Sequence, residues 1–206
     1  MRHKTTEAVF HYFNELRADR TAPLRNEIDP SALKSVLPDL FILEKKRDGS
    51  VRFRLAGTRV CLIMGHELRE RAFTEIWEET VRHRMRLAAD TVLANRTALE
   101  LAVTAIDEEG DTMALEMLLL PLFSNAEHCD RIFGSLVTLE SSIPAEDRWR
   151  FLTPADLFFM HVDADGAPRP AASAASLASR SVASSNLGSP AARITHLRVL
   201  EGGRRD

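Results

Sequence analysis

Two groups of strand-like segments, one on each side of a helical stretch, constrain the fold of this chain more than any other feature. Residues 40–46 and 51–55 are rich in β-branched and aromatic side chains, and Arg47-Asp48-Gly49-Ser50 joins them. An Asp-Gly pair between two such runs is typical of a β-hairpin. Three more strands are predicted later in the chain, at 97–106, 112–123 and 131–140. Strand pairs at both ends of a helical middle predict an α+β fold, an antiparallel sheet with helices on one face.

The stretch between these strands carries helical patterns. Thr58 is placed to cap a helical segment that ends at Gly65, a residue that readily takes the left-handed conformation of a helix end. A short helical turn over 67–71 precedes a longer helix, predicted over 78–93. Apolar residues recur along that helix at intervals of three and four, at Trp77, Val81, Met85, Ala88 and Val92. Before the first strand, the Asp29-Pro30-Ser31 sequence predicts another short helix that runs through Val36.

Residues 1–24 are predicted to form an amphipathic helix and a linker. Thr5 and Glu7 are typical of a helix start, and Pro23 lies in the polar stretch that follows the helix. An apolar stripe on this helix requires a surface to cover it, which is either the chain's own core or a second copy of the chain. We assign the stripe as a candidate dimer interface, made by Val9, Tyr12, Phe13 and Leu16.

The last third of the chain has weaker patterns. Residues 143–163 predict one more docked helix, because Thr153-Pro154-Ala155-Asp156 resembles a helix start. Residues 164–192 are dominated by Ala, Ser and Pro, which is typical of a linker. Residues 193–206 regain apolar positions, so this short segment is expected either to dock on the domain, to bind a partner or to fray.

The bulk composition excludes several classes of protein. A hydrophobic share of 45% and a charged share of 28% are those of a globular chain, and the net charge of −3 gives no reason to expect nucleic acid as a partner. Two cysteines, Cys61 and Cys129, are too few for a disulfide framework or a zinc cluster. No apolar run reaches the roughly 18 residues of a membrane span. We therefore expect a cytoplasmic protein with no membrane partner.

The order of strands and helices, together with several motifs, resembles that of PAS domains. Residues 49–57 resemble the first PAS hairpin, and residues 60–68 resemble the PAS helix that ends in glycine, an aromatic residue and Glu-Leu. In this chain His66 stands where the aromatic residue usually lies. Residues 108–111, with Pro121 closing the strand that follows, resemble the late PAS hairpin.

Three further motifs, at 25–30, 37–44 and 52–58, resemble a family of small bacterial proteins built on a single PAS domain without an output domain. The resemblance implies a five-stranded PAS-like sheet over residues 25–142. It also implies a non-catalytic sensory, signalling or protein-interaction module in a regulatory system. The implied partners are a second copy of the chain and other signalling proteins.

A PAS fold encloses a space between its helices and its curved sheet, which side chains or a small ligand can fill. Apolar residues at these spacings are expected for either case, so both remain open. The candidate lining of a ligand cavity is Phe53, Leu55, Leu62, Met64, Trp77, Met85, Ala88, Leu101, Val103 and Met117. A small-molecule sensor is therefore the first alternative function.

No cofactor, metal site or catalytic residue is predicted. Flavin photochemistry needs a cysteine in a motif that the sequence around Cys61 does not match. Haem needs a histidine that faces the cavity, whereas His83 lies off the apolar stripe and His66 lies in a connection. A basic cluster of four arginines is expected to be a solvated face, although an acidic partner or an anionic nucleotide is the alternative: Arg82, Arg84, Arg86 and Arg96.

The second alternative is a small cavity enzyme, for example an isomerase or a hydrolase. Such an enzyme requires an acid or a base inside the cavity. The candidates for that role are His66, Asp107 and Glu116, which the apolar pattern places outside the cavity.

Overall fold

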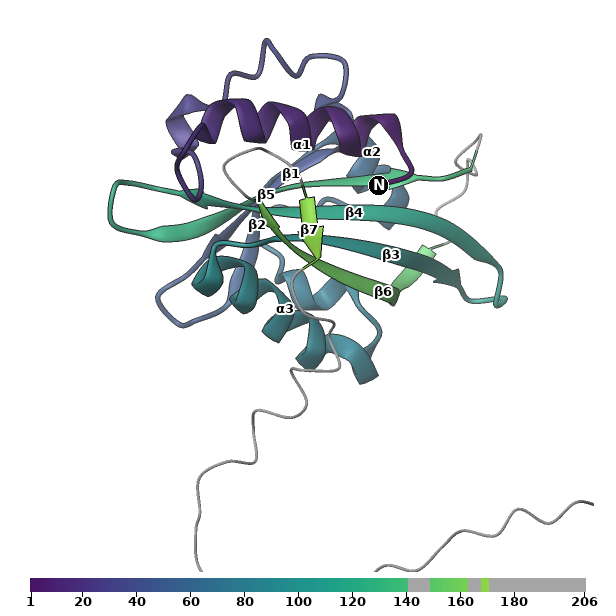
Figure 1. Ribbon diagram of the computed structural model, residues 1–206. Helices are drawn as coiled ribbons and strands as arrows, with labels where there is room; N and C mark the ends of the chain where they lie inside the picture. Colours follow the sequence, from purple (N-terminus) through teal and green to yellow (C-terminus); the bar gives the residue numbers. More distant parts are fainter. Residues whose placement is uncertain (141–148, 163–167, 171–206) are drawn as a thin grey trace, which may run out of the picture.

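The computed structural model describes residues 1–140, 149–162 and 168–170 of the chain. They form one antiparallel sheet of seven strands in the order β2-β1-β5-β4-β3-β6-β7, with helices on both faces (Figure 1). None of the helices in this part of the chain has the length and apolar character needed to cross a membrane. The predicted segment 193–206 and most of the predicted linker lie outside the described residues.

Five of the strands form the sheet that the sequence predicts. Each strand pairs antiparallel with its neighbours, and β5, the last of these five, lies between the two hairpins β1–β2 and β3–β4. The bounds are β1 (Leu40–Lys45), β2 (Val51–Ala56), β3 (Ala98–Asp107), β4 (Thr112–Phe123) and β5 (Cys129–Thr138). The α+β prediction and its PAS-like strand order are therefore confirmed.

The sheet continues beyond β3, where the prediction was wrong. Trp149–Val162 is the strand β6 and not a docked helix, and Pro168–Pro170, inside the predicted linker, is the short strand β7. β6 pairs with β3 along almost its whole length, with two irregularities in register. Without β6, β3 would leave a row of unpaired backbone groups at the edge of the sheet, and this pairing outweighs the local helix signal at Thr153-Pro154.

One face of the sheet, here called the inner face, is covered by the helical middle of the chain. It carries α2 (Thr58–Met64), η3 (Phe73–Ile76), η4 (Glu79–Val81) and α3 (Arg82–Asn95). Gly65 ends α2 with a φ of 69°, as its position predicts. The predicted turn over 67–71 forms irregular turns, and the predicted long helix begins at Arg82, after the η4 turn.

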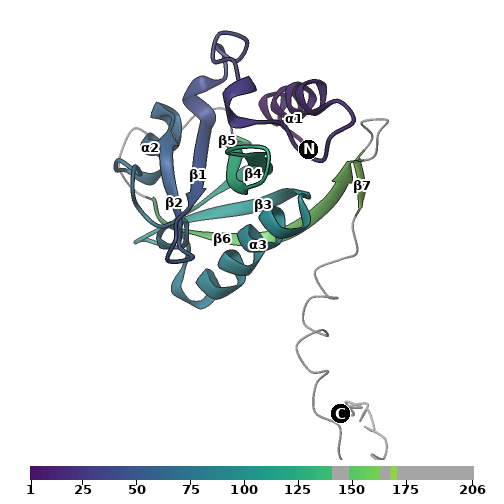
Figure 2. The same cartoon turned by 90° about the vertical axis from the view of Figure 1, so that its left-hand side faces the viewer.

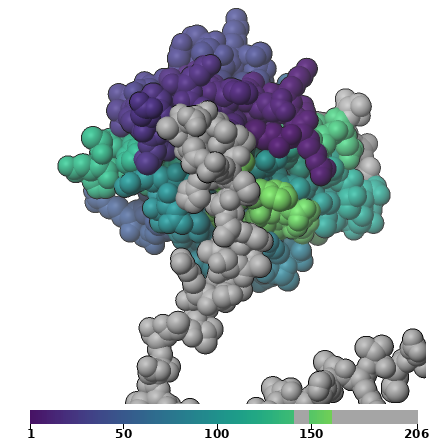
Figure 3. Space-filling view, viewed as in Figure 1, coloured from purple at the N-terminus to yellow at the C-terminus, as the bar shows by residue number. Residues whose placement is uncertain are grey.

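The opposite, outer face carries α1 (Lys4–Arg17), which corrects the prediction of helices on one face only. Figures 1 and 2 show α1 and α3 on opposite sides of the sheet, and Figure 3 shows the outer side of α1 at the surface. His3, rather than Thr5, caps this helix, its Nδ1 accepting the Thr5 N–H at 3.1 Å.

The stripe of α1 is used inside the protomer. Val9 and Phe13 are fully buried in a core with Leu118 and Leu120 of the sheet, whereas Tyr12 and Leu16 are half-buried. Two of the four residues assigned to a dimer interface are therefore core residues of a single chain, since the chain's own sheet supplies the apolar surface that the stripe requires.

Between α1 and β1, the chain follows the rim of the outer face. It forms η1 (Arg25–Glu27), a series of turns over 30–36 in place of the predicted helix, and η2 (Leu37–Asp39). This segment is held close to the end of β2 at Gly57. A Cβ atom built on Gly57 would lie 2.3 Å from the Pro38 carbonyl oxygen, so only glycine permits this approach.

Candidate functional site

The inner core contains a chain of aromatic rings from the sheet to the helices. Phe41 and Phe53 pack edge to face with their centroids 5.6 Å apart, Phe73 lies 6.2 Å from Phe53, and Trp77 lies 5.7 Å from Phe73. All four side chains are completely or almost completely buried. Such pairs add to the stabilisation from buried apolar area.

The predicted cavity lining is largely this same core. All of its members except two are buried in one cluster: Phe53, Met64, Trp77, Met85, Ala88, Leu101, Val103 and Met117. Leu55 and Leu62 are the exceptions, with 47% and 50% of their surface exposed. Leu62 lies on the solvent side of α2, because that helix buries Val60, Ile63 and Met64 instead.

Leu55 leaves the inner face because β2 contains a bulge. Ile42 of β1 pairs with Leu55, but the next residue, Leu43, pairs with Phe53, so Arg54 is an extra residue. An extra residue reverses the alternation of side chains that follow it. Phe53 therefore faces the inner core, and Leu55 faces outward beside Ile42.

Trp77 provides a polar atom within the inner core. Its Nε1 is buried and has no hydrogen-bond partner among the described residues. A buried N–H group without an acceptor costs free energy, and its donor remains available to a ligand oxygen.

None of the three residues considered as an acid or a base for a cavity enzyme belongs to this core. His66 is exposed, and Asp107 is the last residue of β3, where its Oδ1 accepts the Glu109 and Asp111 backbone N–H groups of the turn that follows. Glu116 is buried on the outer face and accepts the backbone N–H groups of Arg2 and His3 at 2.6 and 3.2 Å. The buried carboxylates of this trio therefore hold a turn and the N-terminal segment in place.

The cysteines and the candidate metal ligands have similarly local roles. Burial raises the pKa of the Cys61 thiol, and it raises that of Cys129 to about 11, so neither favours a nucleophilic thiolate. Asp107, Glu109 and Asp111 bring carboxylate oxygens within 4.8 Å of one another at the hairpin turn, a grouping that the sequence analysis did not identify. His83, Arg84 and Arg86 are exposed on α3, as expected for a solvated face.

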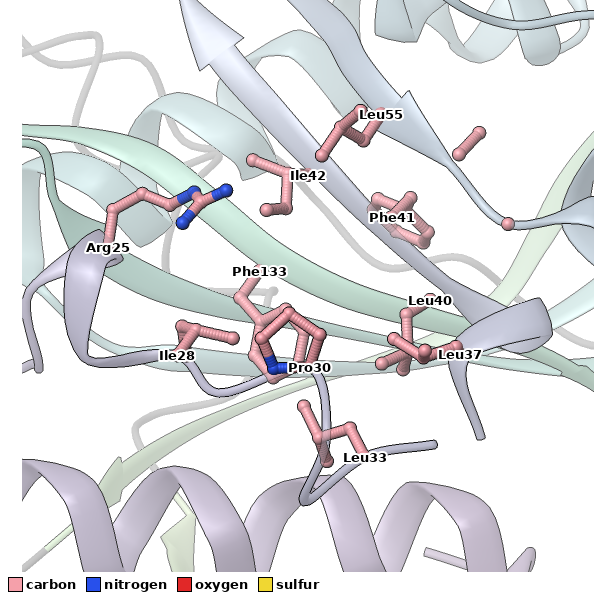
Figure 4. Close-up of a pocket in the computed structure, with 12 residues that line it drawn as sticks. Arg25, Ile28, Pro30, Leu33, Leu37, Leu40, Phe41, Ile42, Leu55 and Phe133 are labelled. Atoms are coloured by element: carbon pink, nitrogen blue, oxygen red, sulfur yellow. The ribbon is translucent and has the colours of Figure 1, made fainter. Parts of the chain in front are cut away.

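A pocket of about 190 Å³ lies on the outer face, where no site was predicted (Figure 4). One wall comes from the rim segment and the other from the ends of β1 and β2, with Phe133 of β5 between them. The lining residues are Arg25, Ile28, Pro30, Leu33, Leu37, Leu40, Phe41, Ile42, Leu55, Ala56, Gly57 and Phe133. The surface they expose is predominantly apolar.

Arg25 is the charged residue of this pocket. It is half-buried, and in Figure 4 its guanidinium extends from the rim segment toward Ile42. The sequence analysis singled out residues 25–30 as a motif without a role. The sequence analysis could not find the pocket. The bulge that turns Leu55 toward the pocket does not change the alternation of apolar and polar residues along β2.

A comparison with protein families agrees with this architecture. A family model described as a PAS domain matches residues 1–137, a span that includes α1 and thus begins before the predicted boundary at residue 25. No curated protein matches the chain.

Among solved structures, the Rhodobacter sphaeroides LOV protein is 12% identical with a TM-score of 0.41, and the match covers 56% of this chain and 70% of that one. The LOV domain of the blue-light photoreceptor Aureochrome1 is 11% identical with a TM-score of 0.40, over 54% of this chain and 82% of that one. The assignment rests on the family model, which matches more than half of the sequence. The chain belongs to the PAS domain family.

Proposed function

We propose that this protein is a non-catalytic regulatory module that acts by binding proteins, first of all a second copy of itself. The observation that carries the proposal is the free edge of β6. This strand pairs with β3 on one side, but on the other side the described parts of the chain cover only its ends. β7 pairs with residues 160–162, and the Glu78 N–H donates to the Leu152 carbonyl at 3.0 Å.

Between these ends, residues 153–159 form no backbone pairs on their outer side with any described part of the chain. Phe158 and Phe151 flank this edge with 53% and 38% of their surface exposed. An unpaired edge with aromatic side chains is a template for strand addition. The opposite edge of the sheet, at β2, is covered, since Phe53 exchanges backbone hydrogen bonds with Glu70 and Arg71.

A second copy fits this edge because two β6 strands can pair antiparallel around a twofold axis. Each copy would offer the other the same unpaired groups, as a closed symmetric interface requires. The α1 stripe, which the sequence favoured for this role, is occupied by the chain's own core. We retain the prediction of self-association and move it to β6, and we retain the cytoplasm as the proposed location.

Sedimentation of the full chain, before and after substitution of Phe158, tests the proposal. The wild type is expected to be a dimer at micromolar concentration, and Phe158→Lys is expected to weaken the dimer by about tenfold or more, because it places a charge at the edge. Leu87→Lys on α3 is the matched control, since Leu87 is similarly exposed at 48%. A monomeric wild type at tens of micromolar would contradict self-association, and a dimer insensitive to Phe158→Lys would contradict the β6 interface.

A ligand sensor is the second candidate function, and the buried Trp77 N–H is the observation that favours it. A ligand oxygen bound in the inner core would satisfy this donor. Native mass spectrometry of freshly purified protein should then show an added mass that Trp77→Phe reduces. Cofactor-free protein with an unchanged mass would count against this candidate. The cysteine motif of flavin photochemistry does not surround Cys61, whose thiol lies 3.7 Å from Glu67 Oε1.

A further inference from the structure

The pocket on the outer face is separate from both surfaces used in the proposed function. It opens on the opposite face of the sheet from the inner core, with whose buried residues it shares only the Phe41 side chain, and it lies at the β1–β2 end, whereas β6 lies beyond β3. The following inference does not depend on dimerisation or on a ligand in the inner core.

The apolar part of the pocket is preformed by the backbone. The β2 bulge sends Leu55 outward beside Ile42, and the absence of a side chain at Gly57 lets the rim segment approach the end of β2. Leu55 and Leu37 remain 47% and 39% exposed at its mouth. Exposed leucines around a hollow leave apolar surface in water, and a small apolar molecule would remove that surface from water.

Arg25 places a positive charge at one side of the otherwise apolar pocket. Its guanidinium forms no ion pair or side-chain hydrogen bond within the described portion of the chain, whereas the neighbouring Glu27 is committed to Arg20 at 3.0 Å. The buried carboxylate near the other end of the rim segment, Asp39, is committed to Arg59. An arginine with unused donors beside an apolar hollow binds an anionic group with charge-assisted, commonly paired hydrogen bonds.

We propose that this pocket binds a small monocarboxylate with a compact apolar body. The carboxylate accepts hydrogen bonds from Arg25, and the body lies among Ile28, Leu55 and Phe133. A cavity of about 150 Å³ lined by Leu, Ile and Phe is known to hold benzene. A pocket of about 190 Å³ therefore suits one ring or a short alkyl chain together with its carboxylate.

Titration of the full chain with benzoate, followed by calorimetry and by methyl NMR, tests the proposal. Benzoate is expected to bind and to shift the methyl signals of Ile28, Ile42 and Leu55, while those of Met85 and Met117 in the inner core stay unchanged. Benzyl alcohol has a similar body without the charge, and benzylamine has the opposite charge. Both are expected to bind at least about tenfold more weakly than benzoate.

Two variants separate the head of the ligand from its body. Arg25→Gln is expected to weaken benzoate binding by about tenfold or more and to leave benzyl alcohol binding unchanged. Leu55→Trp fills the pocket from its exposed mouth and is expected to abolish the binding of both. Arg84→Gln and Leu87→Trp on α3 are the matched controls, because they make the same changes at exposed positions away from the pocket.

Three results would overturn the proposal: no benzoate binding at millimolar concentration, equal binding of benzylamine, or benzoate binding that Arg25→Gln leaves unchanged. If benzoate fails to bind but Leu55→Trp alters the sedimentation of the chain, the pocket is a protein contact and the ligand site is wrong. The thermal midpoint of each variant is measured alongside, so that a loss of binding is assigned only to variants that remain folded. Because these readouts do not involve β6, their failure leaves the proposed interface intact.

Discussion

On the inner face of the sheet, α2, η3 and α3 bury an almost purely apolar cluster. It contains a row of four packed aromatic rings, of which Trp77 is the last. On the outer face, α1 covers β4 and β5, and the irregular rim segment covers the end of β1 incompletely. The inner face thus resembles a closed core. The outer face combines a smaller core with a hollow, an arginine that has no ion pair among the described residues, and a cluster of ion pairs.

The difference between the faces shows how regular structure limits function. Helices that pack along whole strands exclude gaps, as close-packed interiors do. A short run of turns cannot follow a twisted sheet as closely, so the hollow lies where the helical pattern fails. β2 contributes to both faces, since its bulge separates Phe53 from Leu55.

The largest expected effect is the difference in stability between alanine variants of Phe53 and Leu55, the two residues of β2 that face opposite sides. Phe53→Ala should reduce the free energy of unfolding by about 4 kcal/mol, because it opens a cavity among packed rings, whereas Leu55→Ala should cost less than about 1 kcal/mol. Urea denaturation of both variants measures the difference. Similar costs at the two positions would mean that the bulge does not divide the strand between a sealed face and an open one.

Gly57→Ala should come next, at about 2 kcal/mol, because its Cβ would meet the Pro38 carbonyl oxygen at 2.3 Å and force the rim segment away from β2. Gly49→Ala is the control. Gly49 has a φ of +81° and open space around its Cβ position, so its cost is conformational only, at about 1 kcal/mol. Gly57→Ala should also weaken benzoate binding, whereas Gly49→Ala should not. The opposite order of effects would show that the pocket does not depend on the close approach at Gly57.

Arg59→Gln should cost about 2 kcal/mol at pH 7, because it leaves the buried Asp39 carboxylate without the two hydrogen bonds, at 2.8 and 2.7 Å, that Arg59 donates. Burial already raises the pKa of Asp39 above its ordinary value, and Arg59 limits that rise. The folded chain therefore holds this proton to higher pH than the unfolded chain, and stability falls as the pH rises through that window.

Loss of Arg59 widens the window, so the deficit relative to the wild type should shrink when urea denaturation is repeated near pH 4. A deficit that is equal at pH 4 and pH 7 would show that Asp39 is not the group left uncompensated.

The smallest expected effect lies in the ion-pair cluster of the outer face. Burial alone would raise the pKa of Glu44, but hydrogen bonding to Lys46 and the charge of Arg131 lower it on balance. Because the pKa of Glu44 is lowered in the folded chain, the contribution of Glu44 to stability is complete above its unfolded pKa of about 4.3. That contribution is lost as the pH falls through the folded pKa.

Glu44→Gln should therefore cost about 1 kcal/mol at pH 7 and progressively less below about pH 4. Thermal unfolding from pH 3 to 7 measures this effect, with Glu79→Gln at an exposed position as the control. If the pH dependence of thermal unfolding is the same in Glu44→Gln as in the wild type, the ion-pair cluster does not contribute to stability.

The sequence predicted the elements that carry strong local signals. The Asp-Gly turn fixed the first hairpin, Gly65 fixed the end of α2, and the three- and four-residue spacing through Met85 and Val92 fixed the buried side of α3. The prediction of a helix over residues that form β6 was wrong. Thr153-Pro154 resembles a helix start when it is considered alone, but the open edge of β3 pairs with this segment and makes it a strand.

The site was predictable only on the inner face. Alternation along β2 and β3 identified Phe53, Leu101 and Val103 as core residues, and the resemblance to PAS domains indicated what encloses them. The outer pocket was not predictable, because it depends on one extra residue in β2 and on a close approach between segments that are distant in sequence.

Read alone, the amino-acid sequence determined which segments are strands and helices over most of the domain, because the periodicity of apolar residues is a local property of the chain. Only the tertiary structure decided which surface each apolar stripe meets. It turned the α1 stripe from an expected interface into a core, made a strand of residues 149–162, and placed Arg25 beside a hollow. Those outcomes depend on which backbone groups and apolar surfaces remain uncovered after the sheet has formed, and no single segment encodes that.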